Sequence, residues 1–204
     1  MPNRITGVTM NAFNNLQLDA GVFLINFDAS SATTAAALRT SLATAIADPT
    51  KFFGATRGGG TFTATPNTRN IELDGMYYAI KRSTVLEYWD ITLATTLVEL
   101  GGPNFSKTLL ASAESTSGNK TTIQLKNAIE DGDYITKLTW GGDLADGRVC
   151  LIELDNALNT EGVTLTIANR GEGTFPVTFK AHSSDLSTQY APCRVVIVKD
   201  PTTP

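Results

Sequence analysis

The only histidine of the chain, His182, begins a polar string that holds the three residue types of a hydrolase triad, His182-Ser183-Ser184-Asp185. A triad requires a base within reach of the nucleophilic hydroxyl and a carboxylate that orients the base. Neighbouring residues of a strand point to opposite faces, so adjacency in sequence does not give this geometry. We therefore interpret the string as a strand end that enters a polar turn.

Metal and cofactor chemistry find equally little support in the sequence. One histidine and two distant cysteines, Cys150 and Cys193, do not have the spacing of a zinc site. The acidic strings at residues 131–133 and 143–147 are typical of turns, and neither matches a calcium loop. A pair of carboxylates that the fold brings together stays open as a catalytic site, but no local pattern indicates one. We expect no enzyme, no metal and no cofactor.

The only run of glycines, Gly58-Gly59-Gly60, is followed by a strand pattern and not by a helix. It lacks the Lys-Ser/Thr pair of a phosphate-binding loop, and no helix N-terminus follows on which a phosphate can rest. Glycine gives the backbone freedom to bend. We expect the run to form a loop that turns sharply into a strand at residues 61–65.

Composition indicates a folded chain without a strongly charged partner. Hydrophobic residues make up 42% and charged residues 18% of the 204 residues, which supplies a core and argues against disorder. The net charge is -4 and the basic residues are scattered, so tight binding to DNA or to an anionic membrane is not expected. The longest apolar run, residues 20–25, is far shorter than the roughly 20 residues that span a membrane.

The two cysteines lie inside apolar, strand-like runs. We expect Cys150 and Cys193 to be buried thiols, although a disulfide between them stays open. The N-terminus has no apolar signal core. We therefore expect a soluble protein made in a reducing cytoplasm.

Strand patterns dominate the chain. The clearest is a period of two at residues 88–97, where Trp89 and Ile91 share one face. Asp74-Gly75 signals a two-residue hairpin between strands. Residues 148–154 are apolar on both faces, which is typical of a central strand. Further strands are predicted at residues 21–27, 61–65, 70–73, 76–81, 121–126, 134–140, 163–168, 175–181 and 193–198.

One segment has a clear helical pattern instead. Residues 35–47 place Leu38, Leu42 and Ile46 on one narrow apolar stripe. A serine or threonine within residues 30–33 supplies the N-cap, and a proline follows shortly after the last turn. The sequence therefore predicts a helix over residues 35–47.

The expected fold class is mainly β. Residues 104–113 predict a second, shorter helix. The elements together indicate an antiparallel β-sandwich or partial barrel with one or two flanking α-helices. Without repeats or linkers, residues 1–204 are expected to form a single domain.

Two strings of residues resemble a known family. Residues 54–62 have the sequence Gly-Ala-Thr-Arg-Gly-Gly-Gly-Thr-Phe, and residues 69–75 have the sequence Arg-Asn-Ile-Glu-Leu-Asp-Gly. They resemble the tail tube proteins of tailed bacteriophages and related injection particles. In that family a Gly-Ala-Thr-Lys/Arg-Gly-Gly run leads into a strand, and an acidic hairpin ends in Asp-Gly. Segments at 19–27 and 156–162 are also similar, so the resemblance covers about residues 18–198.

The resemblance implies a fold and a role. Tail tube proteins form a β-sandwich or barrel with a flanking helix. Six copies close into a ring, and the rings stack into a hollow tube that conducts DNA or an effector into the host cell. The implied protein is a structural component of the virion tail, assembled in the host bacterial cytoplasm. Its implied partners are other copies of the chain and the tape measure, tube initiator or baseplate, terminator and sheath proteins, with transient passage of DNA.

Within a tail-tube-like domain, residues 28–53 are a helical insertion and residues 199–204 a loose tail. The insertion is either an arm that reaches the adjacent ring or a helix packed on its own sandwich. Hairpins around Asp74-Gly75 and residues 171–173 are candidates for joining strand edges between copies. The ring and stacking candidates are Leu38, Leu42, Ile46, Phe52, Phe53, Arg57, Gly58 and Gly59.

A second set of residues is polar at alternate positions, as a strand lining a wet channel would be. A neutral or acidic lumen lets DNA slide, whereas a basic one would grip its phosphates. The same residues also fit an ordinary solvated face. The lumen-facing candidates are Thr61, Thr63, Thr65, Asn70, Glu72 and Asp74.

Two alternative functions stay open. A tube terminator or neck protein of the same particle would stop at a single ring. A carbohydrate-binding β-sandwich would present exposed aromatic rings. Trp89 lies on an apolar face and is expected to be buried, so Trp140, next to Gly141-Gly142, is the candidate platform.

Overall fold

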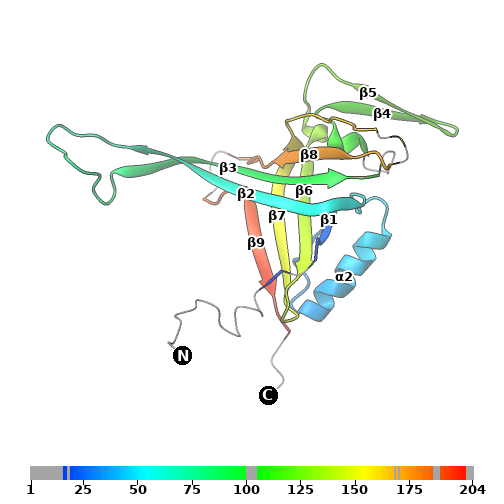
Figure 1. Ribbon diagram of the computed structural model, residues 1–204, viewed down its shortest axis with the longest axis horizontal. Helices are drawn as coiled ribbons and strands as arrows, with labels where there is room; N and C mark the ends of the chain where they lie inside the picture. The colour runs from blue at the N-terminus through cyan, green and yellow to red at the C-terminus, as the bar shows by residue number, and fades with distance from the viewer. Residues whose placement is uncertain are drawn as a thin grey trace.

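The chain is mainly β, with antiparallel sheets and a flanking α-helix, as predicted (Figure 1). The computed structural model describes residues 16–17, 19–99, 105–167, 169, 171–185 and 189–200. Its elements are β1 (Val22–Ile25), α2 (Ala35–Ala47), β2 (Thr56–Asn70), β3 (Thr84–Leu97), the 3-10 helix η1 (Phe105–Thr108), β4 (Ser112–Ser117), β5 (Lys120–Leu125), the 3-10 helix η2 (Asp131–Asp133), β6 (Ile135–Asp143), β7 (Val149–Asn159), β8 (Phe175–Lys180) and β9 (Cys193–Val198).

A seven-stranded sheet, in the order β1-β6-β7-β8-β3-β2 with β9 also on β7, folds over at the end of β7. One edge of β7 pairs with β6, while its other edge takes β9 at residues 149–154 and β8 at Leu158 and Asn159. Asn156, between these two stretches, has a left-handed backbone with φ 45°. The strands β1, β6, β7 and β9 form one wall, and β8, β3 and β2 form a second wall that crosses it (Figure 1).

The main core fills the space between the two walls. Phe175, Val177 and Phe179 of β8 are all buried in it, as their alternation predicts. β7 contributes to two cores, because Leu154 faces the second wall and Leu151 packs under α2. Burial on both faces confirms that this apolar segment is a central strand.

Helix α2 covers the outer face of the first wall. It spans the residues predicted for it, with Leu38 fully buried and Leu42 8% exposed against β1 and β7. Thr34, just after the predicted capping residues, accepts a hydrogen bond from the N–H of Ala37 and caps the helix. In this structure the insertion at residues 28–53 therefore packs on its own sandwich.

Leu38→Ala is expected to lower the free energy of unfolding by about 2–5 kcal/mol, because it leaves a cavity where a fully buried side chain was. Ile46→Ala is the matched control on the same helix. Ile46 is 40% exposed, so its truncation should cost about 1 kcal/mol or less. Urea unfolding followed by circular dichroism measures both. Equal losses would show that Leu38 does not anchor the helix.

Two predicted elements near the body of the sandwich differ from those observed. The helix predicted at 104–113 is wrong: residue 104 lies outside the described residues, and the chain forms η1 and then β4, which pairs with β5. The strand predicted at 163–168 is reduced to one bridge between Thr166 and Thr174, because β8 pairs with β3 and β7 instead. Residue 168 and the tail residues 201–204 lie outside the described part.

The two tryptophans occupy the opposite of their predicted environments. Trp140 is 9% exposed and its indole N–H donates to the carbonyl of Ala20 at 2.9 Å. A methyl group at Gly142 would lie 2.7 Å from the indole ring, so glycine leaves the room that the ring needs. Trp89 is 42% exposed although it shares a face with the buried Ile91, because β3 leaves the sandwich at this point. Trp140 is therefore not an exposed platform for a sugar.

A buried carboxylate fixes the turn that precedes β6. Asp133 Oδ2 accepts a hydrogen bond from the N–H of Glu130 at 2.8 Å and pairs with Nζ of Lys126 at 2.8 Å. Burial by itself would raise the pKa of Asp133, but the Lys126 ammonium and the backbone donor hold this pKa below 3.8. The fold therefore stabilises the ionised form of Asp133.

Asp133→Asn is expected to remove a pH-dependent part of the stability. A carboxyl whose pKa is lowered by folding stabilises the fold above its unfolded pKa, and this contribution is lost as the pH falls through the folded pKa. The stability difference between parent and variant should be largest above about pH 5 and shrink as the pH falls below the unfolded pKa of about 3.9. Thermal unfolding across this range measures it, with Asp131→Asn, an exposed neighbour, as control. A difference independent of pH would contradict this role.

Candidate assembly surface

The β2–β3 hairpin extends far beyond the sandwich. The two strands pair from Thr56 to Asn70, but β8 lies beside β3 only at residues 92–97. Beyond that stretch no other described strand flanks the hairpin, which projects from the body as a long arm (Figure 1). We call residues 65–90 the arm and residues 71–83 its tip. A projecting hairpin of this length brings residues well away from their own core.

Cross-strand contacts support the arm, which does not end in a two-residue hairpin at Asp74-Gly75. Its strands end at Asn70 and begin again at Thr84, so the strands predicted at 70–73 and 76–81 do not form. Asp74-Gly75 is a turn inside the longer tip loop. Cross-strand polar pairs support the ladder: Thr84 donates to Asn70 at 2.8 Å, and Arg69 pairs with Glu87 at 2.9 Å. The arm is therefore ordered by local contacts.

Large apolar side chains are exposed along the arm. At the tip, Tyr77 is 90%, Tyr78 85%, Leu73 65% and Ile80 60% exposed. Leu86, Tyr88 and Trp89 of the arm are exposed as well, although Tyr88 and Trp89 are strand neighbours and point to opposite faces. Isolated hairpins are at best marginally stable in water, and exposed apolar patches mark interaction surfaces. The arm is the strongest candidate for a surface that another molecule covers.

The sequence contained a signal for this surface that the strand patterns did not use. Tyr77 and Tyr78 are consecutive, so no single face of a strand can bury both. Consecutive large apolar residues beside an Asp-Gly turn indicate a loop that another surface must cover. None of the four apolar tip residues was among the predicted interface residues.

Half of the predicted ring and stacking residues pack within the chain's own cores. Leu38, Leu42 and Phe53 are buried in the chain's own cores, and Phe52 packs against the core under α2. Leu38, Leu42 and Phe53 cannot contact another copy while the fold is intact, which corrects the expectation for these three, whereas Phe52 is partly exposed. Sequence alone does not distinguish a side chain that is buried within one chain from a side chain that is buried between two chains.

The remaining predicted interface residues are at least partly accessible. Ile46 is 40% exposed. Arg57 is exposed and pairs with Glu172 at 2.9 Å, which links β2 to the loop before β8. Gly58 and Gly59 have φ of 80° and 74° and lie in a register shift of β2 rather than in a loop before it. The glycine run thus supplies a bend, as predicted, but inside the strand.

The predicted lumen residues divide into two groups. Thr61, Thr63 and Thr65 are exposed on the outer face of the second wall. There Thr63 lies opposite Thr92, and Thr65 lies opposite Asp90, which pairs with Lys180 at 2.8 Å. This face is polar and its charges compensate each other. Asn70, Glu72 and Asp74 are exposed too, but they lie at the end of the arm and in its tip, not on the same face of a strand.

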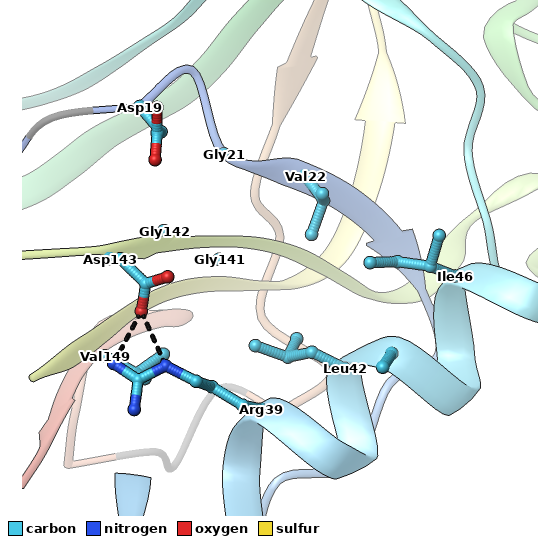
Figure 2. A pocket seen from close by; sticks show the side chains of 11 residues that line it. Asp19, Gly21, Val22, Arg39, Leu42, Ile46, Gly141, Gly142, Asp143 and Val149 are labelled. Carbon is cyan, nitrogen blue, oxygen red and sulfur yellow. Dashed lines mark hydrogen bonds and ion pairs between the residues drawn. The ribbon is translucent and has the colours of Figure 1, made fainter. Parts of the chain in front are cut away.

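A hollow of about 310 Å³ lies between α2 and the end of the first wall. Figure 2 shows Leu42 and Ile46 of the helix directed toward Val22, with the pair of Arg39 and Asp143 at the other end of the hollow. The guanidinium of Arg39 meets Asp143 at 2.9 Å and also donates to the carbonyl of Gly147 at 2.7 Å. Arg39 and Asp143 are paired with each other, which leaves Asp19 as the other ionisable side chain of the lining.

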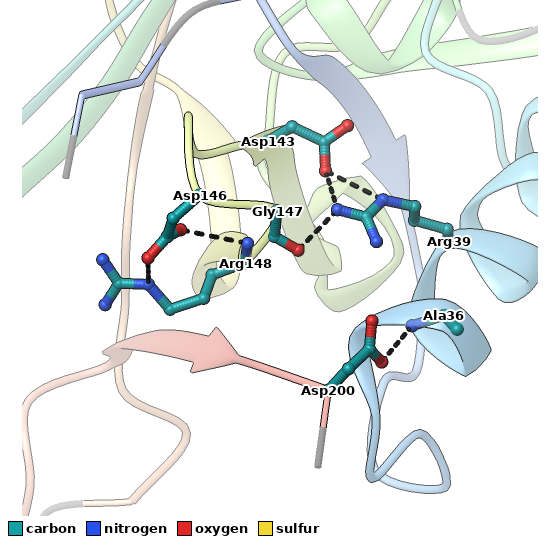
Figure 3. A network of polar contacts seen from close by, with 7 residues as sticks. All are labelled: Ala36, Arg39, Asp143, Asp146, Gly147, Arg148 and Asp200. Atoms are coloured by element: carbon teal, nitrogen blue, oxygen red, sulfur yellow. Dashed lines mark hydrogen bonds and ion pairs between the residues drawn. The ribbon is translucent and has the colours of Figure 1, made fainter. Parts of the chain in front are cut away.

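The same pair belongs to a polar network that ties α2 to the sheet (Figure 3). Arg148 pairs with Asp146 at 2.6 Å in the turn between β6 and β7. Asp200, just after β9, accepts a hydrogen bond from the N–H of Ala36 at 2.9 Å, where a negative charge stabilises the start of the helix. The network fixes the helix and does not indicate a binding site.

His182 lies in a polar turn after β8. Its Nδ1 is 3.2 Å from the carbonyl oxygen of Asn156, and its ring meets Tyr134 edge-on at 5.4 Å. Ser183 Oγ donates to the backbone carbonyl of Asp185 at 2.6 Å. These contacts fit the polar turn proposed from the sequence.

The described part of the chain contains no cluster of metal-ligating side chains. No group of three or more His, Cys, Asp or Glu residues there could hold a metal ion. Cys150 and Cys193 are free, and burial raises the pKa of both thiols. Among the described helices, none is long and apolar enough to cross a membrane. No family model matches the chain, and no curated protein matches it either.

Proposed function

We propose that this chain is a structural subunit, not an enzyme, whose copies join into rings that stack into a hollow tube. The role is that of a tail tube protein in a phage or phage-like particle, assembled in a bacterial cytoplasm, and the ring of six follows from the resemblance at residues 54–62 and 69–75. The observation that carries the proposal is the arm. Its apolar tip lies too far from its own core to be buried there, so a second molecule has to cover it.

The outer face of the second wall supports the same role. Thr61, Thr63 and Thr65 lie beside Thr92 and the compensated pair of Asp90 and Lys180. A basic surface repeated around a ring would hold the phosphates of passing DNA. A face of hydroxyls with balanced charge would let DNA pass, so this face suits the wall of the tube lumen.

Sedimentation velocity over a series of concentrations tests self-association. We expect large species to grow with concentration and to persist at about 1 M salt, because apolar contacts are not screened. A single monomer boundary at every concentration would contradict the proposal. An assembly that stops at one ring would favour a tube terminator instead.

A further inference from the structure

An apolar face at the mouth of the sandwich is uncovered in the described residues. Val195 and Ile197 of β9 are each 54% exposed. They share a face with Cys193, which packs on the main core. Val196 and Val198 point to the other face and pack on the core under α2. Their partners across the ladder are Ile152 and Cys150 of β7. We call Cys150, Ile152, Val195 and Ile197 the β9 face.

The β9 face continues into a hollow between the two walls. This hollow has a volume of about 310 Å³ and is lined by Phe62 and Leu93 from one wall and by Trp140, Cys150 and Ile152 from the other. The result is an open apolar recess next to an exposed apolar strand.

β9 is also an edge strand. One edge pairs with β7, and no described strand pairs with the other edge. A strand edge with an apolar face is a site where another chain adds to the sheet, and soluble proteins normally protect such edges. The edge and the β9 face together form a surface that is incomplete in one copy.

We propose that the arm tip of a second copy of this chain seats on the β9 face. This inference rests on the proposed function and specifies where one subunit holds the next. The tip cannot reach the β9 face of its own chain, because the paired strands hold it away from the body (Figure 1). An arm tip that seats on the β9 face must therefore come from another copy.

The areas of the two surfaces suit each other. Two nearly fully exposed tyrosines and two more apolar side chains give the tip on the order of 500 Å² of apolar surface. A standard interface buries about 800 Å² on each partner, and further exposed apolar side chains of the arm, such as Tyr88, add to the area of the tip. The β9 face offers an apolar strand and a recess as the counterpart.

Charged residues flank the apolar parts of both surfaces. In the tip, Glu72 and Asp74 lie in the first half of the loop and Lys81 and Arg82 in the second. Along β9, Lys199 follows one end, while the Asp155 carboxylate acts on Cys193 at the other end. Asp200 stands beside Lys199, and Arg194 interacts with Asp155, so both ends of β9 are close to charge-balanced and the contact with the tip is mainly apolar.

The geometry makes the contact head-to-tail. Tip and β9 face are different parts of the chain, so a copy that donates its tip keeps its own β9 face free for the next copy. Such heterologous contacts repeat until they close a ring or extend a stack. The inference thus supplies the contact that the proposed tube requires.

Cysteine cross-linking of mixed chains tests this contact. In a background with Cys150→Ala and Cys193→Ala, one chain carries Tyr78→Cys and another carries Val195→Cys. A second pair carries Leu73→Cys and Ile197→Cys. After assembly and oxidation with copper phenanthroline, we expect disulfide-linked dimers in the mixtures and none when each chain is oxidised alone. Mixing Tyr78→Cys with Thr116→Cys, on the exposed end of β4, is the matched control.

Each outcome has a distinct meaning. Particles that assemble without a link in either mixture would overturn the docking site and leave the proposed function standing. Chains that stay monomeric even without the variants would overturn both. A link within one chain between Phe13→Cys and Val195→Cys would show that the N-terminal segment occupies the β9 face, which also overturns the proposal.

Discussion

A chain with Tyr77→Asp and Tyr78→Asp is expected to remain monomeric at concentrations at which the parent protein assembles. Both side chains are almost fully exposed in one copy, so the fold does not need them. At an interface, a buried tyrosine of the kind that dominates binding contributes about 2 kcal/mol, or roughly 30-fold in affinity. Loss of both should weaken association by roughly 1,000-fold, measured by sedimentation.

The control for this variant introduces the same charges elsewhere. Ser115→Asp with Thr116→Asp alters two exposed residues of the β4–β5 hairpin. This variant should assemble like the parent, and both variants should unfold at the parent's urea concentration. Assembly of the Tyr77 and Tyr78 variant at parent concentrations would show that the arm tip is not an interface.

Arg194→Met is expected to destabilise the monomer by about 3 kcal/mol, the lower end of the range for breaking a buried pair, since solvent reaches Arg194. Arg194 is the ion-pair partner of Glu153, whose side chain is fully buried. The second oxygen of that carboxylate, Oε1, has no hydrogen-bond partner among the described residues. Without Arg194 the charge of Glu153 would be buried and uncompensated.

A double variant distinguishes the effect of an unpaired charge on Glu153 from the effect of lost packing by Arg194. Replacing both Glu153 and Arg194 with Met removes the buried charge together with its partner, and apolar replacements of a buried pair are often neutral or stabilising. We therefore expect the double variant to recover most of the loss in urea unfolding. A double variant as unstable as Arg194→Met would show that packing of the arginine stem, not charge, is what the single change removes.

Local patterns predicted the elements whose partners lie within the chain's own core. The helix at residues 35–47 was predicted with its observed bounds, because one apolar stripe and a following proline define it. The alternation of Phe175, Val177 and Phe179 likewise determined which face of β8 is buried. In these segments local propensity and tertiary burial favour the same structure.

The arm could not be predicted in the same way. The alternation in β3 continues through Trp89, but the second wall ends near Ile91, so the same face is buried on one side of that point and exposed on the other. Where a strand leaves its sandwich depends on the lengths and crossings of other strands. The unexpected exposure of Trp89 has this cause.

The candidate interface was missed for a related reason. Leu38 and Leu42 were selected because they are apolar, but apolar residues at regular spacing are usually buried in their own fold, as these are. Tyr77 and Tyr78 follow no period, and that irregularity distinguishes a surface for another molecule from a core. Exposure in the folded chain was needed to identify it.

Electron microscopy of the purified protein at high concentration tests the central claim most directly. If the arm joins copies head-to-tail, the images should show rings of one size that stack into tubes of constant bore. Fields that contain only single compact molecules, at every concentration and salt tried, would contradict it.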